Sequence, residues 1–174
     1  ATISGGFTQS DLLGGTGISE PSLMFMDIDR NGTPDLLISG SDQGGNPVSE
    51  LLTNDGAGQF TATTPTVELH MGGLAVGDIN EDRDADLIII GEDQTGTPSA
   101  RVYDNAGDGT FQQLPNVAAD FVPVSGDVIM EQADVTGDGL LDLLVIGNDG
   151  TLDRAIIYEN RLPVTNDPPA SPEN

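Results

Sequence analysis

One nine-residue acidic segment occurs three times in this 174-residue chain, at Asp27–Asp35, Asp78–Asp86 and Asp134–Asp142. The first, third, fifth and ninth residues of each copy carry an oxygen-bearing side chain. Each copy continues directly into a short run of Leu, Ile and Val, which is Leu36–Ile38, Leu87–Ile90 or Leu143–Ile146. Such bounded apolar runs predict strands. We therefore expect three acidic loops that each lead into a strand.

The spacing of the oxygen-bearing side chains predicts a calcium site in each loop. Carboxylates this close together repel one another unless a cation lies between them, and Ca²⁺ takes about six to eight oxygen ligands. The expected side-chain ligands are Asp27, Asp29, Asn31 and Asp35 in the first loop, Asp78, Asn80, Asp82 and Asp86 in the second, and Asp134, Thr136, Asp138 and Asp142 in the third. The backbone carbonyls at position 7 would complete the shells, from Thr33, Asp84 and Leu140.

Other ions and other loop types fit this pattern less well. Mg²⁺ demands a near-ideal octahedron and retains its waters, and Zn²⁺ prefers Cys and His, whereas the chain has no Cys and one His. An EF-hand has a Glu at position 12 and flanking helices, but position 12 here is Ile38, Ile89 or Val145. Plain acidic turns are the remaining alternative, and three copies at matched offsets argue against them.

A longer repeat surrounds each loop. An asparagine follows the last aspartate of each loop by 19, 19 and 18 residues, at Asn54, Asn105 and Asn160. The first two of these asparagines open Gly-rich turns, Asn54–Phe60 and Asn105–Phe111, which predict hairpins. The loops start 51 residues (78 − 27) and 56 residues (134 − 78) apart. A period of about 50 residues with several short strands is typical of β-propeller blades.

The predicted fold class is therefore all-β, with three four-stranded antiparallel repeats and a calcium loop between strands 1 and 2 of each. A doubly wound parallel sheet would also explain the apolar strands, but the connecting segments are rich in Gly, Thr and Pro and lack helical periodicity. We expect propeller-type repeats over residues 1–161 and a Pro-rich linker or docking tail over residues 162–174. Gly5–Phe7 matches the ends of the two Gly-rich turns, which suggests that residues 1–13 close a preceding repeat.

Charge and composition limit which partners the protein can bind and in which compartment it is expected. The chain has 29 acidic and 5 basic residues, a formal net charge of −24, so nucleic acid and anionic membranes would repel it. The absence of Cys excludes a disulfide framework. The chain begins at Ala1 without Met and has no long apolar segment, which indicates a processed product. Loops of this kind bind calcium weakly and would fill outside cells, so we expect a secreted or surface location.

The repeated motif also resembles a known family. Asp-x-Asp-x-Asn/Asp-Gly-x-x-Asp followed by Leu-Leu-Ile, and later Asn-x-Gly-x-Gly-x-Phe, is similar to the FG-GAP or VCBS-type repeat, the blade of integrin-α-like β-propellers, over about residues 5–160. The resemblance implies four-stranded blades with Ca²⁺ between strands 1 and 2, and roles in adhesion, ligand display or scaffolding. Arg83 departs from the pattern, since Gly usually occupies position 6 of the loop.

We expect a non-catalytic extracellular calcium-binding module with a structural or adhesive role. Because closed propellers have about four to eight blades, three repeats would need a partner. Either the chain is a piece of a longer propeller, or its partner is a second copy, in an oligomer or filament, or another extracellular protein or glycan. The alternative is a carbohydrate- or polymer-binding propeller attached to a secreted enzyme, or a lyase. Glu68 and His70 could form a catalytic pair, but no nucleophile accompanies them, and a half-exposed strand is the simpler interpretation.

Overall fold

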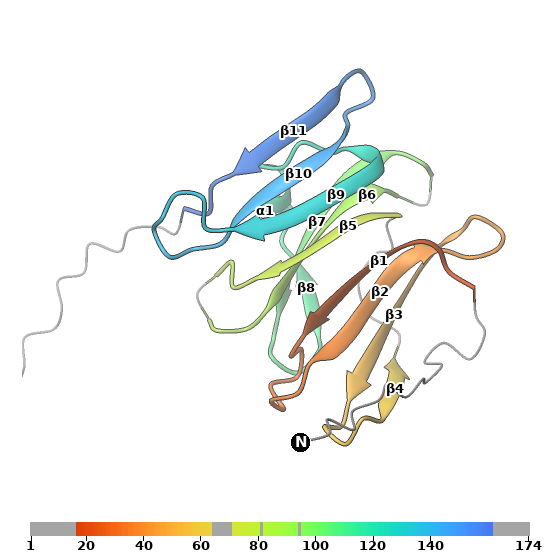
Figure 1. Cartoon of the computed structure of the whole chain (residues 1–174), viewed down its shortest axis with the longest axis vertical. Coiled ribbons are helices and arrows are strands. Elements are labelled where there is room, and N and C mark those ends of the chain that lie inside the picture. Colours follow the sequence, from red (N-terminus) through yellow and green to blue (C-terminus); the bar gives the residue numbers. More distant parts are fainter. Residues whose placement is uncertain (1–16, 64–70, 81, 94, 162–174) are drawn as a thin grey trace, which may run out of the picture.

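A computed structural model describes residues 17–63, 71–80, 82–93 and 95–161, which form three antiparallel sheets (Figure 1). Consecutive strands pair within each sheet. Sheet A contains β1 (Ser19–Met26), β2 (Asp35–Ser41), β3 (Pro47–Asn54) and β4 (Phe60–Thr63). Sheet B contains β5 (Met71–Gly77), β6 (Asp86–Glu92), β7 (Pro98–Asn105) and β8 (Phe111–Gln113). Sheet C contains β9 (Ser125–Ala133), β10 (Asp142–Asn148) and β11 (Asp153–Tyr158).

The all-β, antiparallel prediction is confirmed. Sheets A and B have the expected four strands, whereas sheet C has three within the described residues. Each acidic loop connects the first and second strands of its sheet, as expected. The short helix α1 (Pro115–Ala118), between sheets B and C, was not predicted. The two terminal segments of the prediction, residues 1–13 and 162–174, lie outside the described residues.

The second strands of sheets A and B are covered on both faces, whereas Ile146 on the second strand of sheet C is 36% exposed. Every residue of β2 is buried, and Leu87, Ile88, Ile89 and Ile90 of β6 are 0–6% exposed. In a strand, successive side chains point to opposite faces, so a strand buried throughout needs a partner on each side. Figure 1 shows how sheet B obtains both partners, since it lies between sheets A and C. Its first strand, β5, contacts both β1 and β9.

We call the face of a sheet that turns toward the preceding sheet in the chain its upstream face, and the opposite face its downstream face. At the junction of sheets A and B, the two faces form one hydrophobic cluster of Met26, Ile28, Leu37, Leu51, Leu74, Leu87, Ile89 and Tyr103. At the junction of sheets B and C, they form a second cluster that includes Ala75, Ile88, Ile90, Val102, Leu143 and Val145. Burial of aliphatic side chains at about 25 cal/mol per Å² is the main force that holds the sheets together.

Polar contacts also cross the first junction. The Asn105 side chain is 1% exposed, and its Nδ2 donates hydrogen bonds to the carbonyl of Ile28 at 3.0 Å and to that of Ala85 at 3.2 Å. Ile28 belongs to the loop of sheet A and Ala85 to the loop of sheet B. The guanidinium of Arg30 donates to both carboxylate oxygens of Asp84 and joins the same two loops. Direction-dependent bonds of this kind fix the orientation of one sheet on the next.

The Asn105 contact yields a first prediction. We expect Asn105→Ala to lower the free energy of unfolding by about 1–3 kcal/mol, because buried backbone groups would lose their hydrogen-bond partner. Urea unfolding followed by circular dichroism measures this change. The control is Asn54→Ala at the equivalent turn, where the side chain donates only to Pro34, in its own sheet. Equal losses for the two variants would show that the bond between sheets contributes nothing.

Candidate metal-binding site

The aspartate at position 9 of each loop ties three parts of its sheet together. In sheet A, Oδ2 of Asp35 accepts a hydrogen bond from the Ile28 N–H at 2.9 Å, and Oδ1 accepts one from the Asn54 N–H at 2.7 Å. The same pair of bonds recurs at Asp86, from Ile79 and Asn105, and at Asp142, from Val135 and Asn160. The nearly constant separation of 18 or 19 residues between this aspartate and the later asparagine is therefore explained by a hydrogen bond.

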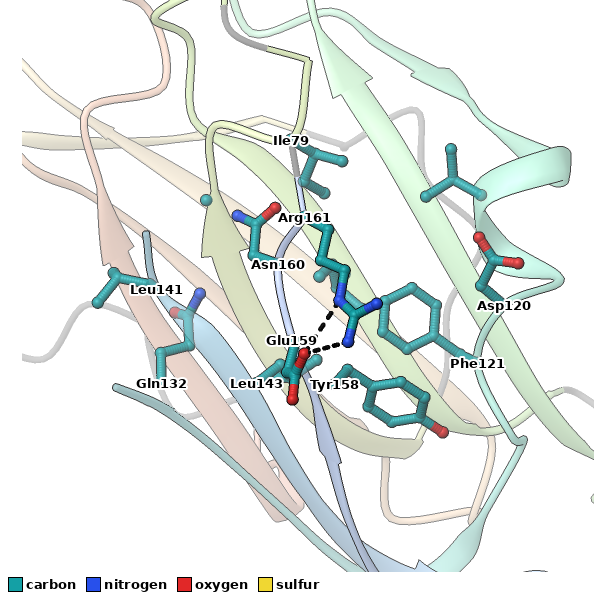
Figure 2. A pocket seen from close by; sticks show the side chains of 13 residues that line it. Ile79, Asp120, Phe121, Gln132, Leu141, Leu143, Tyr158, Glu159, Asn160 and Arg161 are labelled. Carbon is teal, nitrogen blue, oxygen red and sulfur yellow. Dashed lines mark hydrogen bonds and ion pairs between the residues drawn. The ribbon is translucent and has the colours of Figure 1, made fainter. Parts of the chain in front are cut away.

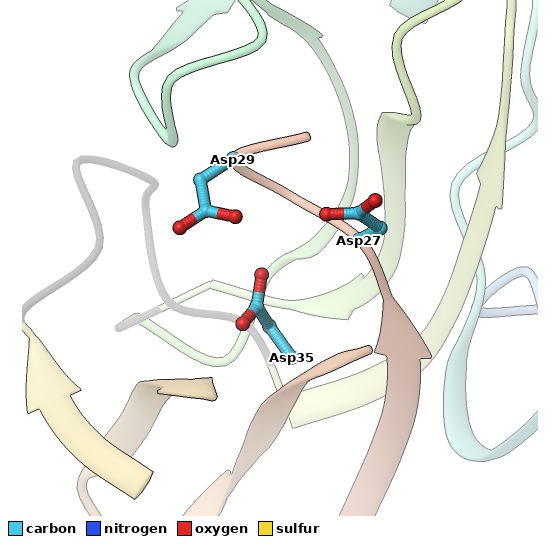
Figure 3. Close-up of side chains that lie close together, drawn as sticks. All are labelled: Asp27, Asp29 and Asp35. Carbon is cyan, nitrogen blue, oxygen red and sulfur yellow. The ribbon is translucent and has the colours of Figure 1, made fainter. Parts of the chain in front are cut away.

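The first loop brings three carboxylates together (Figure 3). One ligand oxygen from each of Asp27, Asp29 and Asp35 lies within 4.8 Å of the others. Oxygens that bind one Ca²⁺ lie about 2.3–2.6 Å from it, so they can be no more than about 5 Å apart. Asp27 is exposed, Asp29 half-buried and Asp35 buried. The spacing fits a cation that enters from solvent and reaches a buried carboxylate.

The remaining oxygens of the first loop are oriented by local hydrogen bonds. The amide oxygen of Asn31 accepts from the Thr33 N–H at 2.8 Å, while its Nδ2 donates to Asp29 at 3.1 Å. Its oxygen thus accepts from Thr33, and its second lone pair is the one that would bind a cation. The Thr33 hydroxyl lies 2.8 Å from the Asn54 carbonyl. Of the expected side-chain ligands, this loop places the three carboxylates together.

The second loop has a different arrangement. Asp78 accepts from the N–H groups of Asp82 and Arg83, at 3.1 and 3.0 Å, and Arg83 has a φ of 75°. Arg83 thus occupies the left-handed conformation that suits Gly at this turn position. The Asp84 side chain is 2% exposed and pairs with Arg30 of the first loop. Asn80 donates to Asp82 and to Asp104, so its amide nitrogen, too, faces carboxylates.

In the third loop, backbone N–H groups take up much of the carboxylate surface. Asp134 accepts from Gly137, Asp138 and Gly139, and Asp138 accepts from Leu140 at 2.9 Å. Asp142 accepts from Thr136 as well as from its two common partners. Within the described part of the chain, three acidic ligand atoms come within 4.8 Å of one another in the first loop alone.

The equivalent aspartates of the second and third loops differ in acidity. Burial raises the pKa of Asp86, and although the N–H groups of Asn105 and Ile79 counteract this, the nearby Asp104 and Asp82 carboxylates raise it further. In contrast, the Asn160 N–H lowers the pKa of Asp142, and the N–H groups of Val135 and Thr136 act in the same direction. A bound cation would therefore relieve an unfavourable charge at Asp86, whereas Asp142 is already stabilised as an anion.

The structure thus defines a class of repeat protein in which small antiparallel sheets pack in sequence and each carries an acidic loop after its first strand. Comparison with protein families gives a match to the FG-GAP-like repeat over residues 27–89 and 78–145. These matches span residues 27–145, more than half of the 174-residue chain, and the protein belongs to the FG-GAP-like repeat family. No curated protein sequence matches the chain.

Glu68 and His70, which the sequence offered as a catalytic pair, lie outside the described residues. Within the described residues, no helix is long and apolar enough to cross a membrane.

The first loop generates a second prediction, in which two isosteric substitutions separate ion binding from folding. Asp29→Asn removes one charge from the carboxylate cluster, and we expect it to weaken Ca²⁺ binding to this loop by about tenfold or more, because affinity depends on ligand charge. Without Ca²⁺ it should change stability by less than about 0.5 kcal/mol. Isothermal titration with Ca²⁺ and unfolding in EDTA measure the two effects.

Asp35→Asn is the matched comparison. Its new NH₂ group would face a backbone N–H, so we expect a loss of about 1–3 kcal/mol even without Ca²⁺. A calcium titration of Asp29→Asn identical to that of the unsubstituted protein would contradict the assignment of the site.

Proposed function

We propose that this protein is a calcium-stabilised, non-catalytic structural module of the extracellular space, built from propeller-type blades. The observation that supports this most strongly is the convergence of Asp27, Asp29 and Asp35 within 4.8 Å in a loop between two strands. Three carboxylates at this separation repel one another. A hard cation with oxygen ligands would remove that repulsion, and Ca²⁺ suits an irregular set of loop ligands better than Mg²⁺ does.

An ion in the first loop would stabilise more than the loop itself. Asp35 already connects Ile28, in the loop, with Asn54, at the end of β3. A cation held by Asp35 and by Asp27, which follows β1, would therefore link three strands of sheet A. We propose Ca²⁺ in the second and third loops as well, about three ions in all, because the same ligand spacing recurs there. An ion would also favour the charged form of Asp86.

The proposed extracellular location follows from calcium supply and from charge. Weak calcium sites fill at the roughly millimolar Ca²⁺ outside cells and stay mostly empty in a resting cytosol. The net charge of −24 would keep such a module soluble and away from anionic surfaces. Both features suit a secreted or surface-displayed protein.

A structural role is supported by exposed apolar side chains on the first strand of sheet A and on sheet C. Leu23 and Phe25 on sheet A are 60% and 56% exposed, and Ile129 and Ile157 on sheet C are 52% and 55% exposed. Exposed apolar surface of this kind marks contact with another macromolecule. The rings of Phe121 and Tyr158 contact each other with their centroids 4.8 Å apart, which favours a packing role for these rings over the stacking of a sugar.

A third prediction tests calcium stabilisation. At about 1 mM Ca²⁺ and a Kd of about 0.1 mM, mass action would stabilise the fold by about 1.4 kcal/mol per occupied loop. For a protein of this size, that corresponds to a rise in Tm of about 3–6 °C per loop. Thermal unfolding in EDTA, and then with excess Ca²⁺, measures the difference. An equal concentration of Mg²⁺ serves as the control and should stabilise less. Identical melting curves in EDTA and Ca²⁺ would refute the proposed function.

A further inference from the structure

Successive residues of the first acidic loop alternate between two roles. Its first, third and fifth residues are expected ion ligands, whereas the second and fourth, Ile28 and Arg30, contact residues of sheet B and its loop. The Ile28 side chain is buried, and the Ile28 carbonyl accepts a hydrogen bond from the Asn105 side chain at 3.0 Å. The first loop is therefore held by the neighbouring sheet at each residue that separates two expected ligands.

The Arg30 contact requires an unusual backbone conformation. Arg30 has a φ of 57°, in the left-handed region that non-glycine residues seldom adopt. Its guanidinium donates to both carboxylate oxygens of Asp84, whose side chain is 2% exposed. A strained conformation persists only where surrounding contacts enforce it, and a buried carboxylate is strongly destabilised without its cation. The pair with Asp84 is therefore the contact that keeps Arg30 in this conformation.

The turn between β7 and β8 packs against the same ion pair. Gly107 has a φ of 77°, and a Cβ added there would lie 2.7 Å from Cζ of Arg30 and 2.9 Å from Oδ1 of Asp84. The backbone of the turn thus lies directly against both charged groups. Three segments, the first loop, the second loop and this turn, meet at one ion pair.

The second loop offers a comparison within the chain. Its residue equivalent to Ile28 is Ile79, and the sheet C residue equivalent to Asn105 is Asn160. Both line a cavity of about 370 Å³ between sheets B and C, together with the contacting rings of Phe121 and Tyr158 (Figure 2). The place of the Asn105 bond at the first junction is thus taken by a cavity at the second.

The third loop makes fewer contacts still at the equivalent residues. Val135, at the second position, is 58% exposed, and a Cβ added to Gly137, at the fourth, would meet nothing within 4 Å among the described residues. Of the three loops, the first is the one whose carboxylates come within 4.8 Å of one another in the described part of the chain. The loop that sheet B holds at both intervening residues is therefore the loop with converging ligands.

We propose that Arg30 and Asp84 position the ligands of the first loop, so that sheet B is part of the calcium site of sheet A without supplying a ligand. The ion pair holds the backbone beside Asp29 in the conformation that places its carboxylate near those of Asp27 and Asp35. Calcium binding and the packing of sheet B on sheet A are then coupled, and each strengthens the other by the same factor. This inference rests on the proposed calcium role and adds the contacts that set the affinity.

A calcium titration that resolves the separate loops tests the coupling. The Gly32 N–H donates to Asp27 at 3.0 Å in the first loop, and the N–H of its equivalent, Gly139, donates to Asp134 at 3.0 Å in the third. In the isotopically labelled full chain, the nuclear magnetic resonance signals of these two amides report Ca²⁺ binding to each loop. Both signals should shift when the unsubstituted protein is titrated.

Two substitutions remove the ion pair from opposite ends. Arg30→Gly suits the left-handed conformation, as Gly137 does at the same position of the third loop, and Asp84→Ala keeps the sequence of the first loop. Each should raise the Kd of the first loop for Ca²⁺ by about fivefold or more, with the Kd of the third loop unchanged. The double variant should show no more than the larger single effect, because both substitutions remove one contact.

The control accounts for the change in charge. Arg154 pairs with Asp149 within sheet C, in the β10–β11 hairpin and outside the acidic loops. Arg154→Ala removes the same charge as Arg30→Gly, and we expect it to leave both Kd values nearly unchanged. Loss of a positive charge on its own would favour a bound cation and lower the Kd, so the expected rise for Arg30→Gly is opposite in sign to a charge effect.

The possible results are distinguishable. An unchanged or lower Kd of the first loop in Arg30→Gly would overturn the coupling and leave the calcium role in place. Equal increases in both loops would also overturn it, because a general loss of structure acts on both. If neither glycine signal responds to Ca²⁺ in the unsubstituted protein, the calcium role is refuted and the coupling with it. Asp84→Ala alone suffices for the test if Arg30→Gly does not fold.

Discussion

Each sheet is organised by a single carboxylate that accepts hydrogen bonds from two distant backbone N–H groups. A buried ionised carboxylate is unfavourable unless it is paired or hydrogen-bonded, and Asp35, Asp86 and Asp142 are 0–2% exposed. Their two oxygens satisfy N–H groups of the loop and of the end of the third strand, which a strand ladder does not reach. The acidic loops can therefore adopt one conformation before any cation binds. A cation would then add to a framework that is already formed.

The strand order and the location of the acidic loops could be predicted from sequence because they depend on local patterns. Asp-rich spacing, apolar runs and Gly-rich turns each act over a few residues. The asparagine 18 or 19 residues after each loop was visible as well. Its role was not, because a hydrogen bond from the Asn54 N–H to Asp35 depends on how β2 and β3 align. The sequence likewise could not show that the Asn31 amide oxygen engages Thr33.

The three loops differ because they make different contacts with neighbouring sheets. The sequence of one repeat does not reveal these contacts. Asp84 was expected to contribute its carbonyl to an ion, and its side chain proves to be an ion-pair partner for Arg30, 54 residues earlier. Similarly, Val76 and Gln132 occupy equivalent positions on β5 and β9, yet only Gln132 reaches across its junction to bond a backbone group. The apolar runs of β6 and β10 look alike in sequence, although Ile90 is buried and Ile146 is 36% exposed.

The short sequence separation of the residues joined by the Asp–Asn bonds affects how the chain folds. These bonds join residues only 18 or 19 positions apart, so each sheet can form its own framework from contacts of short sequence separation. Low sequence separation favours fast folding, and coupling between neighbouring sheets then resembles a one-dimensional array. The first junction carries the Arg30 and Asn105 bonds, and the second carries the bonds between the Gln132 side chain and the Val76 backbone. Sheets A and C each pack on sheet B, so we expect their amide hydrogens to exchange with solvent before those of sheet B.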